Sequence, residues 1–247
     1  MKVQLIQPAV NKKYSRILSS GTIQPIGLIS LATFLHKNLP EIDVEVFDGE
    51  VTPEEEIEKC IDGDIVGVGS TLVTHDNALR IAEIAKEKGA TTIMGGKNAS
   101  VLAENILRNR PYIDYVISGD GELALLDLVK GISPLSIPGV IYRTNSIPVR
   151  NDEQFVDFRE IPFPNLDFTD MSKYFKIYRA KHPHRAHDGM IGIYSQKGCE
   201  WREKTRGCDF CGRLEYKTQQ KDQKELWEYY SALRSLYGSD IIFFIWF

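Results

Sequence analysis

The stretch Asp64-Ile65-Val66-Gly67-Val68-Gly69-Ser70 decides the fold of this chain of 247 residues. Between its polar ends every residue is apolar or glycine, so inward and outward side chains do not alternate. A strand of this kind is buried on both faces, as happens at the centre of a parallel sheet that helices cover on both sides. The stretch therefore predicts an α/β fold.

Similar strand-like runs lie on either side of this stretch, and helix-like runs connect them. The other expected strands span residues 3–7, 44–47, 91–94 and 115–118, and the expected helices span 26–39, a segment that begins at 52, 76–88, 100–108 and 123–129. Strands that alternate with helices on this scale form a parallel sheet with helices on both faces. Residues 1–150 are therefore expected to form a flavodoxin-like or Rossmann-like doubly wound domain, which ends in a hairpin of residues 140–143 and 147–150.

The pattern changes after residue 150. Residues 151–189 contain prolines and aromatic residues without sustained periodicity, which indicates a linker that packs against the rest. Residues 190–195 and 240–247 are strand-like, and 222–237 form an amphipathic helix. Because strand, loop, helix and strand make one unit of a larger β/α array, residues 190–247 are expected to open a second domain of a longer, truncated frame. The alternative is that the last strand completes a small local sheet.

Composition limits the classes of function. A net charge of -4 argues against nucleic acid as the main partner. No apolar run reaches the roughly 18 residues that a membrane span needs. The N-terminal residues enter a strand directly, without the features of a signal peptide. These features predict a cytoplasmic protein.

Cys199, Cys208 and Cys211 lie within thirteen residues and are the candidate metal ligands. A structural zinc ion usually takes four protein ligands. Three cysteines can instead hold a [4Fe–4S] cluster and leave one iron open to another ligand. His184 or His187 could complete a zinc site with the cysteines, so both kinds of metal centre stay open at this point.

Loops after the expected strands are the candidate ligand site, because ligands of open parallel sheets bind beyond the carboxyl ends of the strands. The candidate residues there are Ser70, Thr71, Gly95, Gly96, Gly119, Gly121 and Glu122. None of these loops is a dinucleotide or triphosphate motif. From composition alone, the glycines serve tight turns as readily as ligand contacts.

Five short motifs together resemble the cobalamin-binding domains that are fused to radical SAM enzymes. They are Gln24-Pro25-Ile26-Gly27-Leu28 with Leu31-Ala32, Asp64-Ile65-Val66-Gly67-Val68, Gly95-Gly96-Lys97-Asn98-Ala99-Ser100, Gly119-Asp120-Gly121-Glu122 and Pro138-Gly139-Val140. Their order and spacing agree over about 140 residues. The resemblance implies that the candidate loop residues contact cobalamin. The loop after the first strand, Gln7-Pro8-Ala9-Val10, has no histidine, whereas mutases and methionine synthase have a cobalt-ligating histidine there. No histidine of this loop is therefore expected beneath the cobalt.

The segment Cys208-Asp209-Phe210-Cys211 resembles the second half of the radical SAM motif C-x-x-x-C-x-aromatic-C. Eight residues separate Cys199 from Cys208 where that family has three, so residues 200–207 are expected to lengthen the loop. The resemblance implies a [4Fe–4S] cluster on the three cysteines, with Phe210 near the adenine of S-adenosylmethionine.

In that family the reduced cluster cleaves S-adenosylmethionine to a radical that abstracts hydrogen from the substrate, and cobalamin often carries a methyl group. The sequence therefore predicts a radical SAM enzyme that performs methyl transfer or other radical chemistry on a small-molecule or unknown substrate, with an electron donor as partner. Later strands of that barrel, which supply further S-adenosylmethionine contacts, are absent from the sequence. The alternative is a non-catalytic α/β domain that binds a small ligand and carries a zinc-stapled Cys/His tail.

Overall fold

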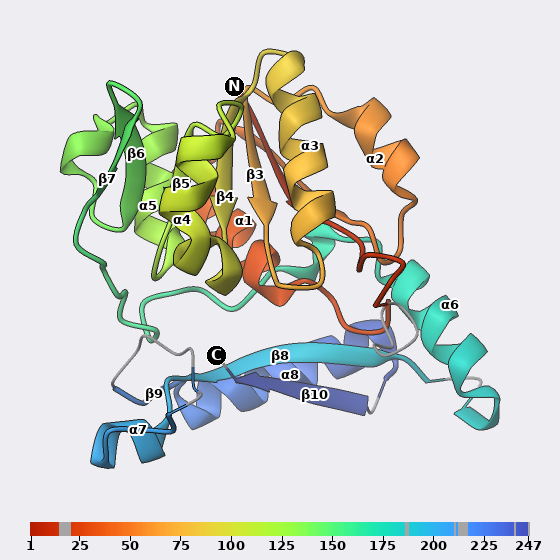
Figure 1. Cartoon of the computed structure of the whole chain (residues 1–247). Helices are drawn as coiled ribbons and strands as arrows, with labels where there is room; N and C mark the ends of the chain where they lie inside the picture. The colour runs from red at the N-terminus through yellow and green to blue at the C-terminus, as the bar shows by residue number, and fades with distance from the viewer. Residues whose placement is uncertain (15–20, 186–187, 210, 212–216, 240, 247) are drawn as a thin grey trace.

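Two β-sheets organise the part of the chain that the structure describes (Figure 1). This computed structural model describes residues 1–14, 21–185, 188–209, 211, 217–239 and 241–246. None of the helices within these ranges is long and apolar enough to cross a membrane.

The described strands of the larger sheet follow the order β2-β1-β3-β4-β5-β6-β7. They are β1 (Lys2–Gln7), β2 (Asp43–Asp48), β3 (Ile65–Gly69), β4 (Thr91–Gly95), β5 (Tyr115–Ile117), β6 (Val140–Thr144) and β7 (Ile147–Arg150). The first five pair in parallel, and β6 and β7 are antiparallel. The order of the parallel strands is that of a flavodoxin-like sheet. The predicted doubly wound fold, with β3 inside the sheet, is confirmed.

Helices cover both faces of this sheet. The helices are α1 (Ile26–Asn38) and α5 (Gly121–Val129) on one face, and α2 (Glu54–Cys60), α3 (His75–Glu87) and α4 (Lys97–Asn109) on the other. Within β3, Val66 and Val68 join the core beneath α3 and α4, whereas Ile65 joins the core beneath α1 and α5. Successive strand side chains point to opposite faces, which explains why β3 is apolar throughout.

The predicted hairpin of β6 and β7 is also confirmed. Asn145 and Ser146, at its tip, have φ of 51° and 66°. Positive φ at both central residues is the geometry of a type I′ turn, whose twist matches that of the two strands. A short helix, η1 (Pro134–Ser136), precedes β6.

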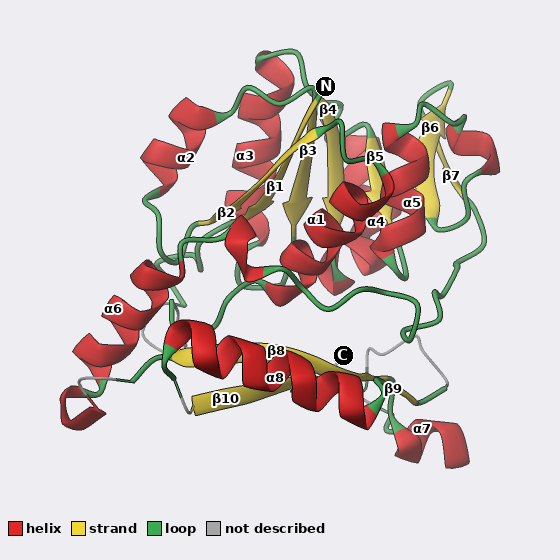
Figure 2. Ribbon diagram, turned by 180° about the vertical axis from the view of Figure 1, so that it is seen from behind, coloured by secondary structure: helices red, strands yellow, loops and turns green. Residues whose placement is uncertain are grey.

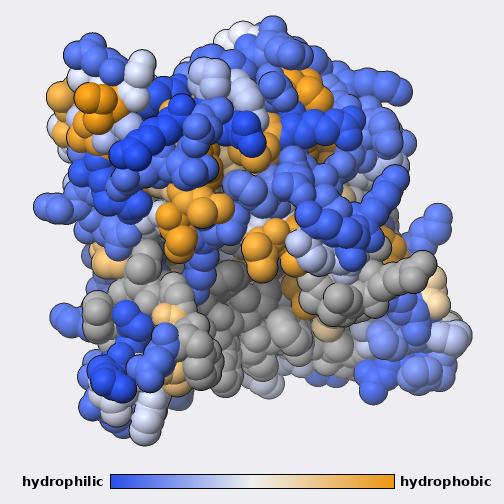
Figure 3. All heavy atoms as spheres, in the orientation of Figure 1, coloured by the Kyte–Doolittle hydropathy of each residue, from blue (hydrophilic) through white to orange (hydrophobic). Residues whose placement is uncertain are grey.

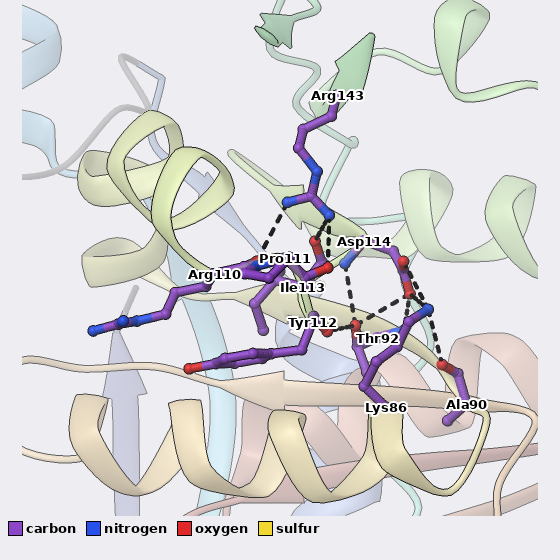
Figure 4. Close-up of polar contacts among 9 residues, drawn as sticks. All are labelled: Lys86, Ala90, Thr92, Arg110, Pro111, Tyr112, Ile113, Asp114 and Arg143. Carbon is purple, nitrogen blue, oxygen red and sulfur yellow. Dashed lines mark hydrogen bonds and ion pairs between the residues drawn. The ribbon is translucent and has the colours of Figure 1, made fainter. Parts of the chain in front are cut away.

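Charged side chains fasten the amino-terminal ends of β4 and β5 (Figure 4). The Arg143 guanidinium donates to the carbonyl oxygens of Leu107 (2.8 Å), Arg110 (3.3 Å), Pro111 (3.0 Å) and Ile113 (2.6 Å). Lys86 Nζ donates to both carboxylate oxygens of Asp114 at 2.8 and 2.7 Å, and Asp114 also accepts from the Thr92 backbone N–H (2.8 Å). Arg143 thereby satisfies carbonyls at the end of α4 that have no partner within the helix.

The smaller sheet has the order β10-β8-β9 among the described residues. Its strands are β8 (Met190–Lys197), β9 (Gln219–Gln220) and β10 (Ile241–Trp246), with α7 (Glu200–Lys204) and α8 (Gln223–Tyr237) between them. β8 and β10 are parallel and α8 connects them, so this region is one β–α–β unit of the kind that the sequence predicts. Asp222 caps α8 by accepting from the backbone N–H groups of Lys224 (2.9 Å) and Glu225 (3.0 Å).

A third apolar core joins the two sheets. Residues of α1, β8, α8 and α6 (Met171–Lys181) form it, among them Ile26, Ile29, Tyr174, Phe175, Ile191, Ile193 and Leu233. The Tyr174 hydroxyl also donates to Asp48 Oδ2 at the end of β2 (2.8 Å). Burial raises the pKa of Asp48 to about 6.

Gln24 makes a second polar contact across this junction. Its buried side-chain amide donates from Nε2 to the Met190 carbonyl oxygen (2.9 Å) and accepts at Oε1 from the Gly192 N–H (2.8 Å). A neighbouring parallel strand would bond to a carbonyl and an N–H two residues apart in the same way. The amide therefore takes the place of one residue of an additional strand beside β8.

The segment 151–189, interpreted from the sequence as a packed linker, contains α6, η2 (Leu166–Phe168) and η3 (Pro183–Arg185). The buried face of α6 is largely aromatic, and Asp170 caps it by accepting from the Ser172 N–H. The lengthened loop 200–207 contains the short helix α7. Cys60, the last residue of α2, is exposed.

Replacing Gln24 with alanine is expected to lower the free energy of unfolding by about 2–4 kcal/mol, because two buried backbone groups of β8 lose their partners. All three tryptophans, Trp201, Trp227 and Trp246, lie in the C-terminal region, so urea unfolding followed by tryptophan fluorescence reports on it. The exposed Gln220 provides the control, and Gln220→Ala should change stability by no more than about 0.5 kcal/mol. Equal effects of the two substitutions would contradict the capping role of Gln24.

Candidate functional site

The carboxyl ends of the parallel strands face the second sheet. In Figures 1 and 2 the parallel strands of the larger sheet run towards β8 and α8. The loops after β1, β3, β4 and β5 therefore share one edge, here called the carboxyl edge. In such sheets ligands bind where the strand order reverses, which here is between β1 and β3. A hollow of about 220 Å³ lies at this point, lined by Gln7, Pro8, Val10, Gly21, Ile23, Glu50, Thr71, Val73 and Thr74.

Hydrogen bonds to backbone hold the loop after β1 in place. The Ala9 N–H donates to Glu54 Oε1 (3.2 Å), and the Val10 N–H donates to Glu50 Oε1 (2.6 Å). Gly49 lets this loop pass closely, because a Cβ at that position would lie 2.4 Å from the Ala9 nitrogen. One wall of the hollow is thus built by contacts within the protein.

Ser70 and Thr71 turn the chain from β3 into α3. Asn98 Nδ2 donates to Ser70 Oγ (3.3 Å), which also lies 3.0 Å from His75 Nδ1. Burial lowers the pKa of His75 and so favours the neutral ring. A neutral ring can accept a hydrogen bond from the Ser70 hydroxyl at Nδ1. The Thr71 N–H donates to Thr74 Oγ1 (3.0 Å), at the start of α3. Ser70 is buried, whereas Thr71 is exposed at the rim.

Gly95 and Gly96, at the end of β4, have different surroundings. Gly96 has a φ of +95°, and a Cβ there would lie 2.7 Å from the Ser70 carbonyl oxygen. Among the described residues, no heavy atom would lie within 4 Å of a Cβ on Gly95. Gly96 is therefore required by packing, whereas Gly95 presents bare backbone to open space, where a flat ligand can approach closely.

Gly119, Gly121 and Glu122 follow β5 at the same edge and have contacts within the protein. Gly119 has a φ of +84°, and its Cβ would lie 3.1 Å from the Gln154 carbonyl oxygen. A Cβ on Gly121 would lie 3.1 Å from Leu31 Cδ2 in α1. Glu122 is buried, and burial, followed by the charge of the neighbouring aspartate, raises its pKa. The structure brings these residues to the carboxyl edge, and the two glycines allow close packing there.

Most of the surface seen in Figure 3 is hydrophilic, with small, separate apolar patches. Two strongly exposed apolar side chains belong to elements that start at the carboxyl edge. Leu72, in the loop after β3, is 73% exposed, and Val101 of α4 is 81% exposed. Apolar groups beside polar loops favour a ligand that has both apolar and polar parts.

The cysteine segment forms a loop whose base is closed by β8 and β9. Lys197 is paired with Gln219 in antiparallel register. Gly198, next along the chain, has a φ of +81°, and a Cβ there would lie 2.1 Å from the Lys217 carbonyl oxygen. Glycine is therefore required where the loop leaves β8.

The three cysteines of this loop are free thiols. Cys199 precedes α7, and the Cys211 N–H donates to the Cys208 carbonyl oxygen (3.0 Å), so the latter two share a turn. Among the residues that the structure describes, no three cysteine, histidine or acidic side chains gather as a metal site. The thiols of Cys199, Cys208 and Cys211 are suitable ligands for an iron–sulfur cluster. The described part of the loop does not bring the three thiols together. Phe210 and His187 lie outside the described residues, and His184 is exposed on η3.

Two positions that the sequence reasoning missed connect this loop and the carboxyl edge. Asp120 and Lys197 form a buried ion pair between the start of α5 and the end of β8. The available signal was the lysine that ends the strand directly before the cysteine loop. Its partner could not be identified, because contacts between distant segments leave no local pattern.

Residues 17–129 match the family of the B12 binding domain. The chain is 35% identical over 190 residues to "Uncharacterized methyltransferase PH0819" of Pyrococcus horikoshii, a match that covers 70% of this chain and 40% of that protein. It is 23% identical over 211 residues to "Cytidylyl-2-hydroxyethylphosphonate methyltransferase" of Streptomyces wedmorensis, which covers 72% of this chain and 38% of that protein. The chain therefore spans two fifths or less of the length of these relatives.

Solved structures show the same fold over almost the whole chain. The cobalamin-dependent S-adenosylmethionine radical enzyme OxsB superposes with a TM-score of 0.78 at 19% identity, over 99% of this chain and 34% of that one. The radical S-adenosylmethionine methyltransferase TsrM from Kitasatospora setae superposes with a TM-score of 0.69 at 17% identity, over 99% of this chain and 47% of that one.

The structure shows a doubly wound α/β domain followed by a β–α–β unit. Residues 17–129 of the first domain match the B12 binding domain, and cobalamin-dependent radical SAM enzymes are among the structural neighbours of the chain. The resemblance recognised in the sequence is confirmed.

Gly96→Ala is expected to destabilise the protein by about 2–4 kcal/mol, because it combines a positive φ with a contact against the Ser70 backbone. Gly95→Ala is the matched control, and it should change the free energy of unfolding by less than about 1 kcal/mol, since its Cβ enters open space. Urea unfolding of the two variants compares them directly. If Gly95→Ala were the more damaging substitution, the assignment of Gly95 to an open surface would be wrong.

Proposed function

We propose that this chain binds a corrinoid at the carboxyl edge of its larger sheet and forms the N-terminal part of a cobalamin-dependent radical SAM methyltransferase. The observation that carries the corrinoid site is the hollow between the β1 and β3 loops, together with the open space beside Gly95. The hollow is lined by apolar side chains, the hydroxyl groups of Thr71 and Thr74, the amide of Gln7 and the carboxyl group of Glu50. This set suits a large amphipathic ring better than a compact phosphate.

A bound corrinoid would supply a cobalt that can carry a methyl group, and the residues of this chain would hold and orient it. Gly95 leaves room beside the backbone, and Thr71 places a hydroxyl at the rim. The backbone of the carboxyl edge is packed closely by contacts within the protein, which involve Ser70, Gly96, Gly119 and Gly121. Glu122 is buried at the same edge. The loop Gln7-Pro8-Ala9-Val10 offers no histidine as a ligand to the cobalt.

The second part of the proposal concerns the cysteine loop. Cys199, Cys208 and Cys211 would hold a [4Fe–4S] cluster, and Phe210 would lie near the adenine of S-adenosylmethionine. The support is the donor chemistry of three free thiols, the turn shared by Cys208 and Cys211, and the position of the loop at the end of β8. Because the described loop does not assemble the three thiols, no catalytic step is assigned to it.

The proposed enzyme would take a small-molecule substrate and electrons from a donor, in a reducing compartment such as the cytoplasm. Such conditions keep thiols available as metal ligands. The rival function is a non-catalytic ligand-binding domain whose cysteines bind zinc with His184 or His187. The exposed position of His184 favours neither metal.

Aquocobalamin is expected to bind the wild-type protein, and Gly95→Leu should weaken that binding at least about tenfold, because the new side chain fills the open space at the end of β4. An absorbance titration measures both affinities, and thermal unfolding checks that the variant is folded. Ala180→Leu, on the exposed side of α6, is the control and should bind like the wild type. A wild-type protein that leaves the corrinoid spectrum unchanged would refute the proposed site.

Anaerobic reconstitution with iron and sulfide should give broad visible absorbance in the wild type and little in Cys208→Ala, because removal of one of three thiolates leaves the cluster underligated. Cys60→Ala is the matched control, since it removes an exposed cysteine far from the loop in sequence. Elemental analysis counts iron and zinc in each sample. One zinc per chain without a cluster would support the rival function instead.

A further inference from the structure

A buried ion pair links the carboxyl edge to the second sheet. Lys197 Nζ pairs with Asp120 Oδ2, and their side chains are only 7% and 9% exposed. Asp120 Oδ2 also accepts from the Val156 N–H (2.7 Å), and Lys197 Nζ lies 5.9 Å from the centre of the Phe155 ring. The pair is therefore removed from water and enclosed by the segment that follows β7.

The two members of the pair come from backbone that is fixed independently. Asp120 lies between Gly119 and Gly121, at the carboxyl edge, and directly precedes α5. Lys197 is the last residue of β8 and precedes Gly198, whose position tolerates no side chain. The ion pair thus connects a loop of the candidate corrinoid site directly to the base of the cysteine loop.

Further contacts hold the same junction, including hydrogen bonds from the buried Lys221 Nζ to the carbonyl oxygens of Phe158 and Ile161. Val156, Phe158 and Ile161 form a small apolar cluster, and Phe158 packs edge-on against Tyr194 of β8, with ring centres 4.9 Å apart. The Gln219 side chain accepts from the Phe158 N–H (2.7 Å). These contacts hold the segment after β7 against the second sheet. The ion pair, in contrast, joins one atom of β8 to one atom of the loop after β5.

A buried ion pair contributes little net stability compared with an apolar pair of the same size, but removal of one partner leaves a costly unpaired charge. A contribution to stability therefore explains poorly why a lysine and an aspartate are buried at this position. Geometry gives a stronger reason, because the pair joins the end of β8 directly to the carboxyl edge.

We propose that Lys197 and Asp120 are positioning residues for the corrinoid site: their ion pair holds the second sheet over the carboxyl edge, so that docking of this sheet and corrinoid binding favour one another. The proposal rests on the proposed corrinoid function. Lys197 lies outside the residues matched by the B12 binding domain, so the site would extend beyond that domain. Coupling of this kind is reciprocal, since a corrinoid that binds the docked form more tightly must also stabilise it.

The test uses the double variant Asp120→Asn/Lys197→Met, which removes both charges and keeps an acceptor for the Val156 N–H. Urea unfolding should show stability close to that of the wild type, whereas Lys197→Met alone should be cleaved by trypsin within residues 151–189 about tenfold faster than the wild type. Lys204→Met is the matched control, because the Lys204–Glu200 pair lies in the same loop but is exposed.

Two measurements with aquocobalamin separate positioning from stability. The double variant should bind the corrinoid about tenfold more weakly than the wild type, by absorbance titration. Saturating corrinoid should slow tryptic cleavage within residues 151–189 about fivefold or more in the wild type and in Lys204→Met, and less than about twofold in the double variant.

The outcomes are distinct. Wild-type affinity and wild-type protection in the double variant would overturn the positioning role while leaving the corrinoid site intact. No corrinoid binding by the wild type would reject the proposed function, and the positioning role with it. Weaker binding together with lost protection, in a variant of unchanged stability, would establish the pair as a positioning device.

Discussion

A strand edge inside a protein must find partners for its backbone N–H and carbonyl groups, and β8 meets this requirement through a side chain. The Gln24 amide bonds to Met190 and Gly192 as a strand residue would. Gln24 lies just before α1, so the start of the first helix and the first strand of the second sheet are held together. The apolar core of α1, α6 and β8 forms around this contact. This contact therefore helps to hold the second sheet beside the carboxyl edge.

The two ends of the larger sheet differ in chemistry. At the amino-terminal end, Arg143 and the Lys86–Asp114 pair occupy the carbonyls and N–H groups of nearby loops. At the carboxyl edge, glycines bring loops close together and Gly95 leaves open space. Side chains also satisfy backbone groups at the carboxyl edge, as Glu54 and Glu50 do for Ala9 and Val10, but the backbone beside Gly95 stays accessible. This division follows from the parallel topology, which places all the βα loops at one edge.

The relatives are much longer than this chain. Only properties of the part that they share with it can be compared. The match to the B12 binding domain and the fold shared with OxsB and TsrM concern residues that are present. The chemistry named for those proteins belongs to chains two to three times as long. The cysteine loop therefore stands as a proposal, supported by donor chemistry and by its place after β8.

The sequence by itself determined the doubly wound sheet, the hairpin and the resemblance to B12 binding domains. The apolar content of β3 predicts a buried strand. The short polar segment Asn145-Ser146 between two strand-like runs predicts a hairpin turn, and both residues have positive φ in the structure. These signals are local, because they depend on burial and backbone preference over a few residues. The aromatic face of α6 was a local signal too, but its spacing is partly hidden among polar neighbours. Only the tertiary structure decided which glycine has free space beside its backbone and which side chain hydrogen-bonds to the edge of β8. The contact between Asp120 and Lys197 also appears only there. Such contacts join segments far apart in the chain, and their energies arise only when folding brings the groups together and removes them from water.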